Sequence, residues 1–398
     1  MLCVGLAPVY HREQVPCPVV IISDLLPPKR GGLADHTARL ANELAAFGPV
    51  SVLTSLGADP GAHFPVRASI GDWSDLEWIA AELGAFADDS VLLWQYVPHM
   101  YGRGGVNRSL PRFWRDMRKA GQRQVFVAHE IMADLVASDL FRHPARCWYA
   151  LNHRRQWKAL LEAADAVHIS TGRWVEDWSA RRPDVASKLS LLPSPTGIAP
   201  VAVPVGHAAA WRAQKGLPAR AKVVAYFGTL NASKQLPWVI DAWRAAHSVE
   251  DPVALAIIGS APAINLPADL RPWLLPLGYL PADEVSRTLH AVDVLALPFL
   301  DGISERRTTL MAGLAHGVAV ATTRGHNTGS ALRKADFLAL SPASAEGEFI
   351  RSVVDLVRDD ARRAKIAAAG LAACAREYSW PVVVGKLRAT LEPKTDGR

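Results

Sequence analysis

Four short stretches of the 398-residue sequence have residue types and spacings that suit the binding of an anion. The first is PPKRGGLADH (27–36), where Gly31 and Gly32 stand between an apolar run and a segment with helical spacing. Glycines there let backbone N–H groups approach a phosphate or sugar oxygen, and the helix dipole favours negative charge. A turn that needs positive φ explains the same pair, so both interpretations stay open. The G-x-G-x-x-G pattern is absent, which counts against a dehydrogenase.

The second and third stretches also follow apolar runs. In VFVAHE, His129 and Glu130 stand where a doubly wound sheet presents ligand-binding groups, although His129 taken alone fits a structural histidine slightly better. In FGTLNASKQLPWVIDA, Gly228 ends an apolar run and Lys234 stands near the start of the next helical segment. A lysine at a helix N-terminus opposes the dipole unless an anion is bound, so Lys234 is a phosphate candidate as well as an ordinary surface lysine.

The fourth stretch, residues 296–323, is the richest in charged side chains. Its polar loop carries Asp301, Glu305, Arg306 and Arg307 ahead of a small-residue helical segment. Arginines at a helix start suit bidentate recognition of phosphate. Adjacent residues point in different directions, so we expect only one of the two arginines to face a ligand. A solvated charged turn is the alternative.

Apolar runs alternating with helical patterns must position these stretches, and they predict two α/β domains with parallel sheets. A segment rich in Pro, Gly and Ala (193–220) reads as the linker. We expect two Rossmann-like, doubly wound domains facing across a cleft, with limits 1–200 and 201–381 and a terminal helix near 382–398 packing back on the first. The predicted strands are 18–24, 50–55, 90–97, 124–130 and 166–170, then 222–228, 253–259, 274–280, 292–298 and 318–323.

Composition excludes several classes of protein. Hydrophobic residues make up 50% of the chain and charged residues 21%, which excludes a long disordered protein. A net charge of +6, from 44 basic and 38 acidic residues, is too weakly basic for a dedicated nucleic-acid binder. Four scattered cysteines predict neither a metal site nor a disulfide framework, and no apolar run is long enough to span a membrane. We therefore expect a cytoplasmic protein.

The four stretches, in this order, resemble the glycosyltransferases of the GT-B fold, and most closely the retaining family 4 group. PPKRGGLADHTARLANEL and VAHE carry the resemblance in the first half, and FGTLNASKQLPWVIDA, LAIIGS, GYLPADEVSRTLHAVDVLALP and MAGLAHGVAVATT carry it in the second. It implies a donor, a UDP- or GDP-sugar, without cofactor or metal. By the same resemblance, Gly31 and Gly32 lie under the donor diphosphate, His129 contacts the donor sugar, and Gly228 and Lys234 hold the diphosphate.

The sequence departs from the family pattern at two places. The arginine usual two residues before Asn231 is Thr229 here, and we hypothesise that Arg306 or Arg307 replaces it. Of the two family glutamates, the second falls on Ala312 and the first near Ser304 or Glu305. The second normally holds the ribose hydroxyls, so nucleoside recognition is in question, while Glu305 or Asp301 remains able to meet the donor sugar. The group is thought to act without a protein nucleophile, and we assign none.

The acceptor is expected on the first domain, where two stretches are basic and contain tryptophan. Arg103–Arg123 has seven basic residues and one acid, and Arg142–Lys158 has five and none. Such helices suit docking on the cytoplasmic face of an anionic inner membrane that carries a lipid-linked acceptor, or they are ordinary solvated faces. The resulting hypothesis is a glycosyltransferase of bacterial polysaccharide or glycoconjugate assembly. A catalytically impaired GT-B-like nucleotide-binding or scaffold protein is the alternative.

Overall fold

The computed structural model describes residues 17–29, 31–59, 61, 63–131, 144–230, 233–260, 264 and 266–392. They divide into two compact units. The first contains the described residues up to His168 together with those from Val384 onward, and the second runs from Ile169 to Val383. The chain therefore leaves the first unit once and returns to it at its carboxy-terminal helix.

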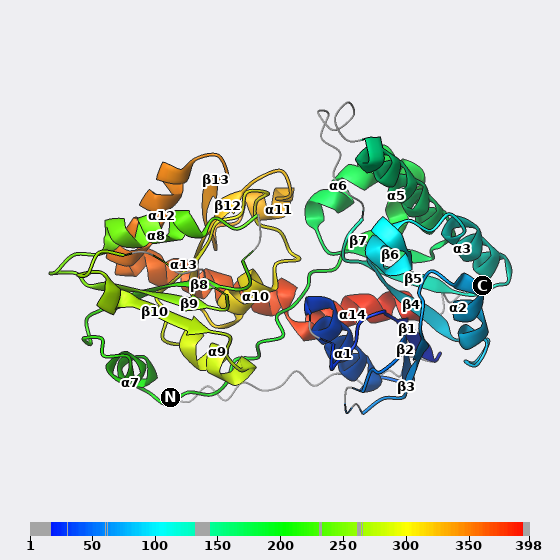
Figure 1. Ribbon diagram of the computed structural model, residues 1–398, viewed down its shortest axis with the longest axis horizontal. Helices are drawn as coiled ribbons and strands as arrows, with labels where there is room; N and C mark the ends of the chain where they lie inside the picture. Colours follow the sequence, from blue (N-terminus) through cyan, green and yellow to red (C-terminus); the bar gives the residue numbers. More distant parts are fainter. Residues whose placement is uncertain are drawn as a thin grey trace. The chain divides into compact units, whose positions relative to one another are not determined.

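Parallel strands form one sheet that begins in the first unit and a second sheet that lies within the second unit (Figure 1). Among the described residues, the first sheet has seven strands in the order β3-β2-β1-β4-β5-β6-β7, and the second has six in the order β10-β9-β8-β11-β12-β13. The predicted fold class, two doubly wound α/β sheets, is confirmed. In the first sheet the strands are β1 (Val19–Ile22), β2 (Val50–Ser55), β3 (Val66–Ile70), β4 (Val91–Tyr96), β5 (Gln124–Ala128), β6 (Ala166–Ile169) and β7 (Leu189–Leu191). In the second they are β8 (Lys222–Phe227), β9 (Val253–Ile258), β10 (Leu274–Gly278), β11 (Val294–Leu297), β12 (Ala319–Arg324) and β13 (Ala339–Pro342).

Helices connect the strands, as parallel pairing requires. Before β7 the chain forms α1 (Gly32–Ala45), α2 (Leu76–Leu83), α3 (Leu110–Lys119), α5 (Pro144–Ala163) and α6 (Gly172–Arg181). After it come α7 (His207–Gln214), α8 (Leu236–Ala246), α9 (Ala282–Leu289), α10 (Thr308–Ala315), α11 (Ser330–Arg333), α12 (Glu346–Arg358), α13 (Asp360–Ala373) and α14 (Trp380–Leu391). Helix α7 lies inside the segment interpreted as a linker.

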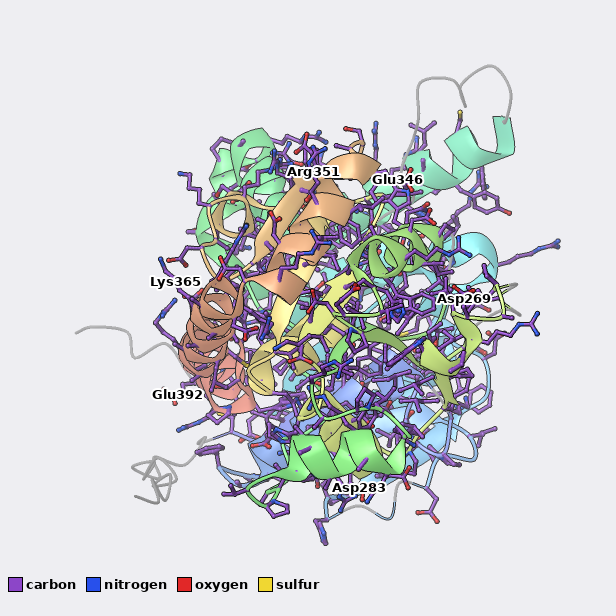
Figure 2. The ribbon with its side chains drawn as sticks, turned by 90° about the vertical axis from the view of Figure 1, so that its left-hand side faces the viewer. Asp269, Asp283, Glu346, Arg351, Lys365 and Glu392 are labelled. Atoms are coloured by element: carbon purple, nitrogen blue, oxygen red, sulfur yellow. The ribbon has the colours of Figure 1, made fainter. Side chains whose placement is uncertain are left out.

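The core of the second unit lies on both faces of its sheet. Along β8, Val223 and Ala225 pack into one apolar cluster, whereas Val224 and Tyr226 pack into another. The first cluster includes residues of α9 and α10, and the second includes residues of α8 and α12. The outer faces of α12 and α13 carry charged side chains, among them the exposed Arg351 on α12 and Lys365 on α13 (Figure 2).

The first unit has an aromatic core. Trp94 of β4 stacks on Phe126 of β5 with 5.9 Å between ring centroids, and Trp114 of α3 packs edge-on against Phe126 at 5.4 Å. The guanidinium of Arg123 donates hydrogen bonds to the carbonyls of Thr390 and Leu391, the last residues of α14, and of Glu392, which follows them. These bonds hold the end of the predicted terminal helix, whose residues 393–398 lie outside the described part of the chain.

Candidate functional site

In the second unit, a short backbone pairing carries Lys234 to the end of a neighbouring strand. Ser233 accepts a hydrogen bond from the Leu300 N–H at 2.7 Å, and the Gln235 N–H donates to the Pro298 carbonyl at 3.1 Å. Lys234 is thereby paired with Phe299, just after β11. Strands β8 and β11 are adjacent, and the connections on their two sides run in opposite directions. Ligands bind at such switch points in doubly wound sheets.

The Lys234 ammonium is held in a confined space. Its Nζ lies 5.7 Å from the ring centroid of Tyr226. Gly228 has φ +119, which favours glycine, and a Cβ there would lie 2.5 Å from Lys234 Nζ, so the lysine would have to move to accommodate a side chain. Burial, with a smaller contribution from the nearby Arg307, lowers the pKa of Lys234 to about 8. A bound anion would stabilise the charged form of this ammonium and raise its pKa again.

Arg307 and Arg306 share one carboxylate and then diverge. Arg307 Nη2 donates to Asp301 Oδ2 at 2.5 Å, whereas Arg306 Nη2 lies 3.7 Å from the same oxygen. Arg307 stacks on Phe299 at 4.3 Å, whereas Arg306 lies over Trp174 at 5.2 Å. Burial lowers the pKa of Arg307, and Asp301 opposes that shift. Arg307 is therefore the arginine that shares its surroundings with Lys234.

We call Lys234, Arg306 and Arg307 the cation cluster. Asp301, the carboxylate that pairs with it, also accepts a hydrogen bond from Asn327 Nδ2 at 3.1 Å. Three cations against one carboxylate leave a positive excess in a partly buried place. The two arginines of the cluster lie directly before α10, whose first turn carries no acidic side chain. Electrostatics and helix dipole both favour an anion here.

Glu305 is placed differently from the cations beside it. Its side chain is fully buried, and Oε2 accepts a hydrogen bond from the Gly172 N–H, the first residue of α6, at 3.0 Å. Within the described residues, Oε1 has no hydrogen-bond partner. Burial raises the pKa of Glu305, and the bond from Gly172 opposes the shift. Ala312, where a second glutamate is usual, lies fully buried in the apolar core.

In the first unit, the two predicted glycines begin α1. Gly32 is its first residue and Gly31 precedes it. A Cβ at either position would meet no atom within 4 Å, so the space around this helix start is open. No close approach within the described chain explains the pair, but Gly31 has φ +153, so the turn with positive φ that was the alternative interpretation is present at Gly31.

His129 stands at the end of β5, with its ring near a second histidine. Its Nε2 lies 2.8 Å from Gln95 Oε1 of β4, and its ring centroid is 4.9 Å from that of His36 on α1. Burial is the main cause that lowers the pKa of both histidines, to about 4 for His36. Both are neutral at pH 7. Glu130, the next residue, is exposed.

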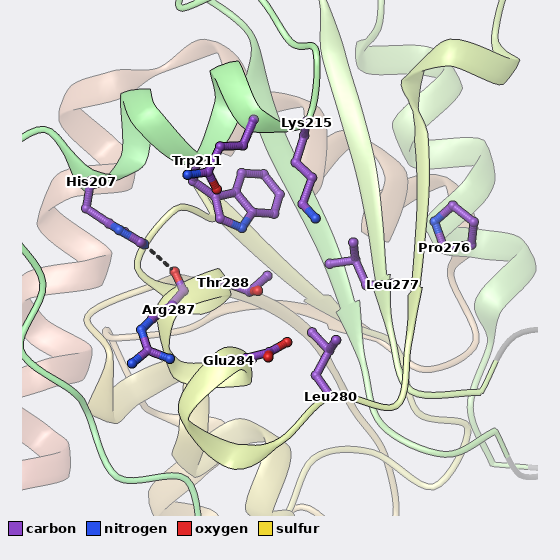
Figure 3. A pocket seen from close by; sticks show the side chains of 10 residues that line it. His207, Trp211, Lys215, Pro276, Leu277, Leu280, Glu284, Arg287 and Thr288 are labelled. Carbon is purple, nitrogen blue, oxygen red and sulfur yellow. Dashed lines mark hydrogen bonds between the residues drawn. The ribbon is translucent and has the colours of Figure 1, made fainter.

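A separate pocket of about 610 Å³ lies between α7, β10 and α9 of the second unit (Figure 3). Trp211, Lys215 and Glu284 are among its lining residues, and His207 Nε2 donates to the Arg287 carbonyl at 2.8 Å. Its lining mixes both signs of charge. None of the predicted site residues lines it.

The structure thus brings Gly228, Lys234 and Arg307 together, with Arg306 beside them. Sequence reasoning missed the aromatic supports Phe299 and Trp174 and the amide of Asn327. Phe299 follows an apolar strand directly, which was an available signal, whereas nothing local marks Trp174. Within the described ranges, no group of His, Cys, Asp and Glu has the arrangement of a metal site, and no helix is long and apolar enough to cross a membrane.

Comparison with known proteins gives a family for part of the chain and a fold for nearly all of it. Residues 221–359 match the family described as "Glycosyl transferases group 1". No curated protein sequence matches. Anabaena HepE, solved in complex with UDP and glucose, has a TM-score of 0.65 at 14% identity, covering 94% of this chain and 99% of that one.

Two further solved structures agree. The sucrose-phosphate synthase of Thermosynechococcus elongatus has a TM-score of 0.65 at 16% identity, with coverage of 94% and 99%. WaaG, a glycosyltransferase involved in lipopolysaccharide biosynthesis, has 0.62 at 15%, with coverage of 95% and 100%. The chain is therefore a protein of the GT-B fold, and its residues 221–359 match the model of the family described as "Glycosyl transferases group 1".

Proposed function

We propose that this protein transfers a sugar from a nucleotide-sugar donor to an acceptor hydroxyl, and that the cation cluster binds the donor's diphosphate. The observation that carries the proposal is the partly buried excess of positive charge at the β8/β11 switch point. A lysine whose pKa is about 8 gains Coulomb energy from a diphosphate and regains a full charge. HepE, of the same fold, was solved with UDP and with UDP-glucose.

The chemistry follows from what the leaving group needs. The bond between the anomeric carbon and the phosphate oxygen breaks as the acceptor oxygen bonds to that carbon, and the acceptor proton passes to the departing phosphate. Lys234 and Arg307 stabilise the charge that develops on the diphosphate. We propose that the reaction needs no metal, because Lys234 and Arg307 neutralise the charge on the diphosphate. We also propose that it proceeds with retention of configuration and without a protein nucleophile.

Arg307 can also replace the arginine that the family pattern has at the position of Thr229. A cation is missing where the family places one, and Arg307 supplies a guanidinium within Coulomb range of Lys234. Gly228 contributes space rather than charge. We retain Gly31, Gly32 and His129 as proposed contacts to the sugar or the acceptor. For Glu305, the bond to Gly172 supports a structural role beside any contact with the donor sugar.

The first test is a thermal-shift panel of the purified protein against UDP, GDP, ADP, NAD and the corresponding nucleotide sugars. Stabilisation grows with ligand concentration relative to the dissociation constant. We expect one nucleoside diphosphate and its sugar conjugate to raise Tm, and NAD to leave it unchanged. A shift with NAD alone, or with no nucleotide, would overturn the proposal.

A second candidate is a GT-B-like protein that binds nucleotide without turnover. The buried, apolar setting of Ala312 favours it, because no carboxylate is available there for the ribose. Incubation with the sugar conjugate that shifts Tm distinguishes the two. Release of nucleoside diphosphate, by transfer or by slow hydrolysis, supports the enzyme. Binding without any release supports the scaffold.

We further propose that the acceptor is lipid-linked and belongs to bacterial polysaccharide or glycoconjugate assembly, and that α3 and α5 dock on an anionic membrane. Trp148 and Leu151, 44% and 56% exposed, share a face of α5 with the exposed Arg155. Arg108 lies 6.0 Å from the Trp148 ring centroid. Arg142, at the start of the basic stretch, lies outside the described residues.

Sedimentation with vesicles tests this docking. We expect binding to vesicles with 30 mol% phosphatidylglycerol and none to pure phosphatidylcholine, with the double variant Trp148→Ala/Arg155→Ala weakened. Equal binding of the variant would contradict the assignment of this surface.

A further inference from the structure

The loop that follows β12, residues 325–328, packs directly against the loop that carries Asp301. Gly302 has φ +84, and a Cβ there would collide with the backbone nitrogen of Gly325. A Cβ at Gly325 would in turn lie 2.6 Å from the backbone carbonyl of Asp301. The two loops therefore meet backbone on backbone, and neither glycine position has room for a side chain.

Asn327, in the loop after β12, holds Asp301 at two points. The Asn327 N–H donates to the Asp301 carbonyl at 2.9 Å, and its Nδ2 donates to Asp301 Oδ2 at 3.1 Å. The Gly325 N–H donates to Thr328 Oγ1 at 3.0 Å, which closes the turn around Asn327. Asn327 is 6% exposed, so its amide is committed to the interior of the protein. One residue thus fixes both the backbone and the carboxylate of Asp301.

Asp301 in turn holds the Arg307 guanidinium. The oxygen that accepts from Asn327, Oδ2, also accepts from Arg307 Nη2 at 2.5 Å. Within the described residues, Arg307 Nε is buried without a hydrogen-bond partner, so the guanidinium depends on Asp301 and on the Phe299 ring. Phe299 is itself anchored to β12, because its N–H donates to Thr323 Oγ1 at 2.8 Å. Strand β12 and the loop after it therefore support both contacts of this arginine.

An arginine that binds an anion must be held in place without being neutralised. Burial disfavours the charge on Arg307, and the Asp301 carboxylate opposes that effect. A guanidinium has five N–H donors, and the bond to Asp301 uses one of them. The amide of Asn327 takes up acceptor capacity of the same oxygen, which limits how far Asp301 draws the guanidinium onto itself. Asn327 thereby acts on the position of a charge without carrying one.

We propose that Asn327 is a positioning residue for the donor's diphosphate: through Asp301 it holds Arg307 in place, with the remaining guanidinium donors available to the phosphate oxygens. This inference rests on the proposed function. It gives the loop after β12 a part in donor binding, through a residue that contacts neither phosphate nor sugar.

Calorimetric titration tests the inference on wild type, Asn327→Ala, Arg307→Ala and the double variant. The ligands are inorganic pyrophosphate and whichever of UDP, GDP and ADP wild type binds best. Asn327→Ala removes no charge, and we expect it to weaken binding by about 2- to 12-fold, the equivalent of one ordinary hydrogen bond. Arg307→Ala should cost about 12- to 150-fold, the range for a hydrogen bond to a charged group. The double variant should lose no more than Arg307→Ala, because the amide then has no arginine to position.

The pH profile gives a readout that a loss of stability alone would not move. Arg307 lowers the pKa of Lys234, because like charges disfavour the protonated form. If Asn327→Ala lets the guanidinium move away, the pKa of Lys234 rises. The alkaline loss of nucleoside diphosphate affinity should then begin at a higher pH than in wild type, as it should in Arg307→Ala. An unchanged profile in Asn327→Ala would contradict the positioning role.

Asn152→Ala is the matched control, because Asn152 is 7% exposed and donates a hydrogen bond to the Trp148 carbonyl at 2.8 Å in the other unit. If Tm shows that Asn327→Ala does not fold, the nearly isosteric Asn327→Leu, which also removes the amide, takes its place.

The outcomes separate this inference from the proposed function. Full affinity in the Asn327 variant, an equal loss in Asn152→Ala, or losses that add in the double variant would overturn the role of Asn327 while the phosphate site stands. If neither Arg307→Ala nor Lys234→Ala weakens the binding of pyrophosphate or nucleotide, the proposed function itself fails.

Discussion

The two sheets share a strand order but carry side chains of different charge at the carboxyl ends of their strands, at the point where the connections change direction. In the second unit, the β8/β11 switch point carries Lys234 and Arg307, cations whose neutral forms are favoured by burial. In the first unit, strands β1, β4 and β5 lead to His36 and His129, which are uncharged at pH 7. One fold thus supplies a cluster of cations in one half and a pair of neutral histidines in the other. The difference lies in a few residues after the strands, not in the sheets.

The difference in charge between the two units has a physical explanation under the proposed function. A diphosphate needs fixed positive charge, whereas sugar hydroxyls need groups that donate and accept without charge. The depressed histidine pKa values keep the first unit's polar residues in that second state. The following tests are ordered by the size of the expected effect.

Removing the Lys234 ammonium should have the largest effect. Lys234→Ala is expected to weaken nucleoside diphosphate binding by about 1.5–3 kcal/mol, the range for hydrogen bonds to charged groups. Titration calorimetry measures the loss. Lys215→Ala is the matched control, because Lys215 also lies over an aromatic ring, with Nζ 5.8 Å from the Trp211 centroid, outside the cluster. Equal losses of nucleotide affinity in both variants would contradict the assignment of the cation cluster as the binding site.

Variants of Glu305 test whether this charged residue of the fourth stretch has a structural role or contacts the ligand. Glu305→Ala leaves the Gly172 N–H without its acceptor and should lower the free energy of unfolding by about 1–3 kcal/mol. Glu305→Gln keeps an acceptor oxygen and should lose much less. Urea unfolding gives both values. If Gln matches Ala in lost transfer activity while stability is retained, Glu305 contacts the donor instead.

Acid should destabilise the first unit through its neutral histidines. His36 has a folded pKa of about 4 against 6.5 for the unshifted group, so the unfolded chain binds more protons between these values. Stability is therefore lost as pH falls through this window, by about 2 kcal/mol at pH 5 for this one group. Hydrogen exchange in α1 at pH 7 and pH 5 measures it, corrected for intrinsic exchange rates. His36→Gln should reduce the loss, and an unchanged loss would remove His36 as its cause.

The affinity for nucleotide should fall at alkaline pH. Lys234 loses its proton near pH 8 in the free protein, and diphosphate binding must restore it. We therefore expect UDP binding to weaken by up to about tenfold per pH unit above pH 8, since the phosphate charge is already constant there. Lys234→Arg keeps its charge and should bind evenly from pH 7.5 to 9.5. The same slope in that variant would point to another group.

The central strands were predictable from sequence because burial on both faces makes them apolar throughout. Strand β2 was predicted at its observed limits, 50–55. The strands that sequence reasoning did not name, β3, β7 and β13, all lie at sheet edges, where one side is unpaired and the apolar signal is weaker. Helix α7 was missed because its Ala-rich sequence adjoins the Pro- and Gly-rich run.

The candidate site was predictable only one residue at a time. Lys234 was found from its place near a helix start, but its pairing with Phe299 is a long-range contact that local spacing does not reveal. The choice between Arg306 and Arg307 depended on which aromatic ring each one met. Glu305 and Gly172 are 133 residues apart, so its role as a cap for α6 left no local signal.

The lowered pKa of Lys234 makes this residue chemically distinguishable from the other lysines. Near pH 8 about half of its side chains carry a free amine, the nucleophilic form, whereas an ordinary lysine is almost entirely protonated. A brief exposure to an acylating reagent should therefore mark Lys234 early, and a bound diphosphate should shield it. The feature that prepares this site for an anion thus provides a covalent reporter of whether the site is occupied.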